Sequence, residues 1–227
     1  MGRILTGSTS RVRIARPSLR QTHAVAASIV VLFAALHLAN HLVALGGVAA
    51  HIAFMDMARH VYRQRFVEGA LLVCAALQIG TGLTMVFRRA WPAKPLMRAQ
   101  AIAGIVLALF LLVHIGAVLG ARLSLRLDTN FYFAAAGLHT RSWAWFFAPY
   151  YIGAVVALFA HLGCAVQRRR RAGPAWRWPV AGAAAGLIVG TTIVLCLAGA
   201  LVHVEIPPAY RLMFEPEASL TGHDFAL

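Results

Sequence analysis

The stretch Phe33-Ala-Ala-Leu-His-Leu-Ala-Asn-His-Leu42 places two histidines, His37 and His41, one helical turn apart inside a long apolar run. The run extends from about residue 24 to 48, longer than the ~20 residues that span a bilayer and far longer than the ~7–15 residue core of a signal peptide. We interpret it as a retained transmembrane helix. Ionisable side chains at membrane depth are costly and rare, so both histidines are candidate functional residues.

The amino-acid composition indicates which class of protein the chain belongs to, soluble or membrane-embedded. Of its 227 residues, 60% are hydrophobic and 12% charged, and the mean hydropathy is +0.73, which is typical of a polytopic membrane protein. The net charge of +14 is attributed to membrane topology and anionic lipid. Nucleic-acid binding would require basic residues interleaved with aromatics on one soluble face, and none is visible. Each of the three cysteines lies alone in an apolar segment, and we interpret them as small apolar helix residues: Cys74, Cys164 and Cys196.

Five apolar runs predict an all-α integral membrane bundle, with spans at about 24–48, 66–88, 98–120, 148–167 and 179–204. A basic cytoplasmic arm (1–22) precedes this domain (23–205), and an outer acidic tail (206–227) follows it. The segment 131–137 is apolar but too short to cross, and we expect it at the interface beside Trp143 and Trp145.

The charges predict the orientation of the bundle. Fourteen Lys and Arg residues fall on the side of the N-terminal arm and seven on the other side. The positive-inside rule therefore places the N-terminus inside and the C-terminus outside. All seven acidic residues then lie on the outer side: Asp56, Glu68, Asp128, Glu205, Glu215, Glu217 and Asp224.

Depth along each helix groups the histidines. At 1.5 Å per residue, His37, His41 and His114 lie roughly 20, 26 and 24 Å from the inner ends of their helices, whereas His161 lies in the inner half. Facing imidazoles at one depth suit b-type haem; the alternative is hydrogen bonding between helices, which we favour for His161 alone. His203 is placed at an outer helix end, and the remaining histidines are expected at the surface: His23, His51, His60, His139 and His223.

Several local motifs follow one another in a characteristic order over about residues 20–165. They are Arg20-Gln-Thr-His23, then His37-Leu38 or His41-Leu42, then Ala49-Ala50-His51 with Phe54-Met55-Asp56, then Gly104 ten residues before His114, and Asn130-Phe131 followed by Tyr151 ten residues before His161. This order resembles the single-polypeptide, five-helix, dihaem cytochrome b subunit of succinate dehydrogenase/fumarate reductase complexes.

The resemblance implies a ligand set. In that family the first four helices each give one haem ligand, helices 1 and 3 holding the outer haem and helices 2 and 4 the inner one. It implies that His37 or His41, together with His114, binds the outer haem iron, and that His161 belongs to the inner site. This chain departs from the family at Gln78, where a histidine is expected, and helix 2 contains no histidine. We therefore expect one haem, with His161 a remnant or a hydrogen-bond partner of Gln78.

The resemblance also implies a function: a membrane anchor of the bacterial cytoplasmic membrane that transfers electrons between quinone or menaquinone and separate flavoprotein and iron–sulfur subunits on the cytoplasmic side. Such a chain is a non-catalytic electron-transfer subunit. Asp56, and less strongly Glu68, would handle quinone protons; the alternatives are a solvated loop charge for Asp56 and a helix N-terminal acid for Glu68. A haem-free relative with an anchoring or assembly role is the competing function. A small transporter or sensor ranks lowest, because the spans contain no paired acids.

Overall fold

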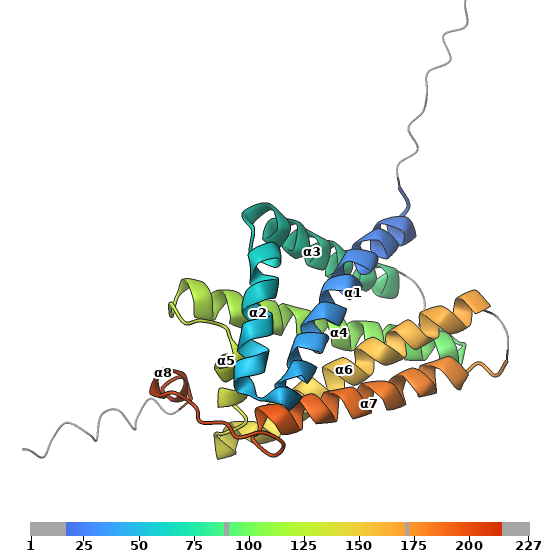
Figure 1. The fold of residues 1–227 in the computed structure, drawn as a ribbon. Coiled ribbons are helices and arrows are strands. Elements are labelled where there is room, and N and C mark those ends of the chain that lie inside the picture. The colour runs from blue at the N-terminus through green and yellow to red at the C-terminus, as the bar shows by residue number, and fades with distance from the viewer. Residues whose placement is uncertain (1–16, 89–90, 171–172, 215–227) are drawn as a thin grey trace, which may run out of the picture.

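The computed structural model describes residues 17–88, 91–170 and 173–214, and within these ranges every regular element is a helix (Figure 1). Five helical segments are long and apolar enough to cross a membrane. They are α1 (Leu19–Val43) with the short 3₁₀ turn η1 (Ala44–Gly46), α3 (Arg65–Phe87), α4 (Pro95–Leu123), α6 (Arg141–Arg170) and α7 (Arg177–Leu197). The all-α fold and the five candidate spans are confirmed, and they indicate a multi-pass membrane protein.

The ends of the spans differ from the prediction at three main places. Helix α6 begins at Arg141 rather than near residue 148, and the start of α1 and the end of α7 also differ. Helix α1 begins early because Ser18 and Gln21 form a reciprocal capping box at its N-terminus. Helix α7 ends at Leu197 rather than near residue 204, and Gly199 follows with a positive φ of 79° that favours glycine. The predicted arm up to residue 16 and the tail from residue 215, with Glu215, Glu217, His223 and Asp224, lie outside the described residues.

The first outer connection was expected to be a loop, and this expectation is wrong. It contains the 15-residue helix α2 (Val48–Tyr62), which runs crosswise to α4, α6 and α7 (Figure 1). The segment has no Gly or Pro between residues 48 and 62, so nothing interrupts a helix, although its charges and histidines break up the apolar run.

Two short helices complete the same end of the molecule. Helix α5 (Phe131–Ala136) corresponds to the short segment expected at the interface, but its Phe131 side chain is fully buried. Helix α8 (Pro208–Arg211) brings Tyr210 onto the bundle, where its hydroxyl donates to the Asp128 carbonyl at 3.0 Å. The first part of the tail is therefore packed against the bundle.

Helices α6 and α7 form the closest helix pair, because glycines let their backbones meet. The repeat Gly182-x3-Gly186-x3-Gly190 runs along one face of α7, as in small-residue interfaces of membrane helices. A Cβ atom built on Gly186 would lie 2.8 Å from Val156 Cα and 2.9 Å from the Val155 carbonyl oxygen. No side chain longer than hydrogen fits there without moving the helices apart.

The other side of the bundle is held together differently. Helix α1 packs against α3, and α4 packs against α3 and α6. Over their described lengths α1 and α4 are not closely packed against each other, and they meet through long side chains instead. Cys164 and Cys196 are buried and Cys74 is half-buried, and all three are free thiols, as expected for apolar helix residues.

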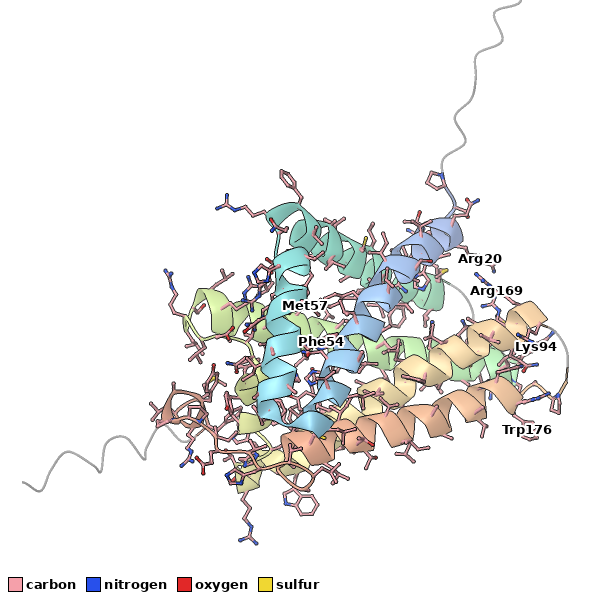
Figure 2. The ribbon with its side chains drawn as sticks, viewed as in Figure 1. Arg20, Phe54, Met57, Lys94, Arg169 and Trp176 are labelled. Atoms are coloured by element: carbon pink, nitrogen blue, oxygen red, sulfur yellow. The ribbon has the colours of Figure 1, made fainter. Side chains whose placement is uncertain are left out.

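The two ends of the bundle differ in charge: the described carboxylates all lie at one end, where arginines accompany them, and the charged side chains described at the other end are positive. Arg20, Lys94, Arg169 and Trp176 gather at one end, away from Phe54 and Met57 on α2 (Figure 2). The four described carboxylates are at the other end, on α2, at the start of α3, after α4 and after α7. We call these the basic end and the acidic end.

Candidate functional site

Histidine rings from three helices meet near the acidic end of the bundle. His37 and His41 lie one turn apart on α1, with ring centroids 4.7 Å apart, because residues four apart share a helix face. The His37 ring is 6.1 Å from that of His114 on α4, and the His41 ring is 5.2 Å from that of His51 on α2. The structure thus brings together His37, His41 and His114, and it adds His51.

His37 and His114, whose rings face each other, each stack against a phenylalanine one helical turn earlier. Phe33 stacks on His37 with centroids 5.8 Å apart and an interplanar angle of 15°. Phe110 stacks on His114 at 5.1 Å and 14°. The Phe-x3-His spacing therefore occurs on both helices. Each phenylalanine limits the rotation of the imidazole that stacks on it. The Phe-x3-His spacing is therefore a sequence signal for the site, and the prediction from depth along each helix did not use it.

His51 was expected at the surface, and this expectation is wrong: it is only 2% exposed. Its ring meets the edge of Phe131 at 5.1 Å, and Asn40 Nδ2 donates to its Nε2 at 3.2 Å. Burial, followed by the nearby His37 and Arg59, lowers the pKa of His51 to about 4. The amphipathic helix α2, which sequence reasoning missed, is what buries this residue.

Three buried polar atoms in this cluster have no hydrogen-bond partner: Asn40 Oδ1, His41 Nδ1 and His51 Nδ1. Buried polar atoms are almost always paired, since leaving one unpaired costs about 1–3 kcal/mol. Their concentration in one place indicates that the cluster is completed by a bound group or by water.

The two carboxylates predicted for proton transfer are engaged by arginines. Asp56 is on α2 with its side chain 56% exposed, and Arg59 Nη1 donates to it at 3.4 Å. Glu68 forms an ion pair with Arg122 that joins α3 to α4. Arg59 also pairs with Asp128 at 2.9 Å, and this contact helps to raise its pKa against the opposing effect of burial. The network holds the acidic end together.

His161 lies apart from this cluster, toward the basic end, and its partner differs from the one considered. His161 Nδ1 donates to the Gln100 carbonyl on α4 at 3.0 Å. Gln78 donates instead to Nε2 of His23, a residue expected at the surface, at 3.1 Å. That expectation is therefore wrong for His23, which is half-buried on the face of α1 that packs against α3.

The remaining histidines take structural or surface positions. His139 is exposed, as expected, and its Nε2 donates to the Leu197 carbonyl at 3.0 Å, which ties α7 to the turn before α6. His60 is exposed on α2 and donates to the Asp56 carbonyl of its own helix. His203 is exposed and lies 3.2 Å from Glu205. None of these three joins the cluster on α1, α2 and α4.

Within residues 17–88, 91–170 and 173–214, no three His, Cys, Asp or Glu side chains are arranged to hold a bare metal ion. A haem iron needs fewer protein ligands, since the porphyrin supplies four ligands and the protein only the axial ones.

Comparison with family models, curated proteins and solved structures found no match to this chain.

Proposed function

We propose that the chain is a haem-b-binding membrane anchor that carries electrons between a membrane quinone and a succinate dehydrogenase/fumarate reductase-type partner. In this proposal it lies in the bacterial cytoplasmic membrane with its N-terminus inside and its C-terminus outside. Five apolar helices support the anchor. The sequence count of Lys and Arg, fourteen on the side of the N-terminal arm and seven on the other, supports the orientation, because positive residues are retained on the cytoplasmic side.

The observation that carries the proposal is the separation of the His37 and His114 rings, 6.1 Å between centroids. With metal–imidazole bonds of about 2 Å and each ring centre roughly 1 Å behind its nitrogen, two axial imidazoles have centroids about 6 Å apart. The spacing therefore fits a bis-histidine iron. It also favours His37 over His41 as the α1 ligand, since His41 is turned toward His51.

The surroundings of the two rings also fit a flat cofactor. Helices α1 and α4 are not closely packed, so a planar group between them does not require close backbone contacts to be broken. Phe33 and Phe110 restrain the two imidazoles. When bound there, haem supplies a one-electron relay at the acidic end of the bundle.

Proton handling is assigned to Asp56 in this proposal. Its side chain is exposed at the acidic end, and a carboxylate exposed there could exchange protons with a quinone head group. Glu68 is paired with Arg122 between two helices, which favours a structural role for it. Flavoprotein and iron–sulfur subunits would dock at the basic end, where positive side chains face the cytoplasm.

The test is the reduced-minus-oxidised absorption spectrum of the purified protein. We expect a b-type α band, lost in part or whole in His37→Ala and in His114→Ala but retained in His41→Ala. His60→Ala is the control, because the His60 side chain is exposed and its ring hydrogen-bonds the Asp56 carbonyl of its own helix. A well-folded wild-type protein without an α band would exclude the haem function and leave the haem-free anchor.

A further inference from the structure

Two arginines lie over one tryptophan ring at the basic end of the bundle. The ring belongs to Trp178, a half-buried residue in the first turn of α7. The guanidinium carbon of Arg170, the last residue of α6, lies 5.1 Å from the ring centroid. The guanidinium carbon of Arg177, the first residue of α7, lies 5.6 Å from the same centroid. We call these three residues the arginine clamp.

The backbone that carries the clamp is held against the neighbouring helix. A Cβ atom built on Gly163 of α6 would lie 2.8 Å from the Trp178 carbonyl carbon and 3.0 Å from Pro179 Cα. Both distances are shorter than an ordinary carbon–carbon contact of about 3.5–4.0 Å. Glycine at this position therefore lets the start of α7 lie directly on α6. The indole ring then orders both arginines, because its face attracts a guanidinium cation.

The clamp brings two positive charges together. Both guanidinium carbons are measured from one ring centroid, so they are at most about 11 Å apart, close to the Debye length of ~10 Å at 0.1 M salt. Their fields therefore overlap. Within residues 17–88, 91–170 and 173–214 the carboxylates all lie at the acidic end, so none of them neutralises Arg170 or Arg177. The clamp is suited to attract an anion.

Other basic side chains strengthen the positive potential around the clamp. Arg168 Nη1 donates to Gln100 Oε1 at 2.9 Å, and this neutral acceptor leaves the charge of the guanidinium in place. Arg20, Lys94 and Arg169 gather at the same end of the bundle (Figure 2). A phosphate group is the anion that paired guanidinium N–H groups bind best, together with carboxylates.

The clamp lies at the level where lipid head groups are expected. The charged end of α6 begins at Arg168, and the apolar part of α7 begins after Pro179. Trp91 and Trp176 are exposed at this same end, and tryptophan is enriched where a membrane protein meets the head groups. Anionic lipids in the cytoplasmic leaflet attract basic segments at that level.

We propose that the arginine clamp is a binding site for the phosphate group of an anionic phospholipid. Arg170 and Arg177 donate to the phosphate oxygens, and Trp178 holds both guanidinium groups in place. Val166 and Val180, exposed about one turn further into the apolar part of α6 and α7, contact the acyl chains. This site does not depend on haem binding and requires only that the apolar helices cross a membrane.

The experiment is native mass spectrometry of the purified full-length protein, titrated in detergent with phosphatidylglycerol or with phosphatidylcholine. We expect the first phosphatidylglycerol to bind more tightly than the first phosphatidylcholine. Each basic residue near a membrane surface strengthens the binding of anionic lipid roughly five-fold. Arg170→Gln/Arg177→Gln should therefore weaken phosphatidylglycerol binding by about 25-fold and leave phosphatidylcholine binding unchanged. Trp178→Leu keeps both charges and should weaken phosphatidylglycerol binding by about two- to five-fold.

The matched control is Arg20→Gln/Lys94→Gln, which removes the same formal charge at the same end of the bundle and leaves the clamp intact. It should keep most of the preference for phosphatidylglycerol. Equal losses in the two double variants would show a general attraction between charges and overturn the clamp. If the Arg170/Arg177 variant cannot be purified, Trp178→Leu decides, and wild-type binding in that variant refutes the clamp.

Two further outcomes concern the identity of the occupant. Equal affinities of the wild type for the two lipids would refute the lipid site and leave the arginines to contact a soluble protein. An excess of inorganic phosphate should not remove the preference for phosphatidylglycerol when chloride at the same ionic strength does not. If phosphate does remove it, the clamp binds a free anion and the lipid assignment is wrong.

Discussion

Replacing Gly186 by alanine should separate the α6–α7 pair and destabilise the protein. The added Cβ would lie 2.8 Å from Val156 Cα, whereas carbon atoms in contact are normally about 3.5–4.0 Å apart. The helices must therefore move apart by roughly 0.7 Å or more. Backbone atoms cannot rotate away as a side chain can, so we expect a loss of about 1–3 kcal/mol in the free energy of unfolding, the usual cost of overpacking.

Gly153→Ala is the matched control for this prediction. Gly153 lies on α6, and a Cβ there meets no atom within 4 Å. Alanine is also the better helix former by up to about 1 kcal/mol, so this variant should be neutral or slightly stabilised. Unfolding of both variants in mixed micelles, followed by circular dichroism against the mole fraction of dodecyl sulfate, gives the comparison. Equal stabilities for the two variants would refute the backbone-contact reasoning.

Three further predictions concern the acidic end. Glu68→Gln should lower the free energy of unfolding by about 1 kcal/mol, and a double-mutant cycle with Arg122→Gln should show that the effect depends on the pair. The pKa of His51 is about 4 in the folded protein against an ordinary 6.5, so the free energy of unfolding should be highest above pH 6.5 and should fall by at most about 3 kcal/mol as the pH drops toward 4. His51→Phe should flatten that pH dependence in thermal unfolding. Tyr210→Phe should cost about 1 kcal/mol through the lost bond to the Asp128 carbonyl and should speed trypsin cleavage after Arg211.

The spans were predictable from sequence because a helix that crosses lipid needs a long, nearly uncharged apolar run. Each span needs a long apolar run and is bounded by charges such as Arg65 or Arg88, so composition alone locates it. The end of α7 was less predictable. Apolar residues continue past Leu197 to about 204, and only the backbone conformation at Gly199 shows that the helix has stopped.

The candidate site was only partly predictable, since α2 was missed. Counting apolar residues treats Asp56 and Arg59 as loop markers, although both are on one helix and share an ion pair. His51 was consequently placed in solvent. The two residues that α2 buries most, His51 and Met55, lie four apart on one helix face, and a search by mean hydropathy does not detect that spacing.

The choice between His37 and His41 could not be made from depth. Depth was counted along each helix from its own inner end, as if all axes were parallel, but α1 crosses the bundle obliquely (Figure 1). The facing partner of each ring depends on that tilt. The partner of Gln78 was unpredictable for a similar reason, since His23 reaches it only because the capping box at Ser18 extends α1 far enough to include His23.

The contrast between the two sides of the bundle has a consequence for biogenesis. The α6–α7 hairpin is closed by direct backbone contact at Gly186, so it can form as soon as its two helices are inserted. The α1 and α4 helices meet through His37 and His114, and parting them leaves the hairpin intact. We therefore expect maturation in two stages, in which the α6–α7 half forms first and α1 docks last, when the His37 and His114 rings meet.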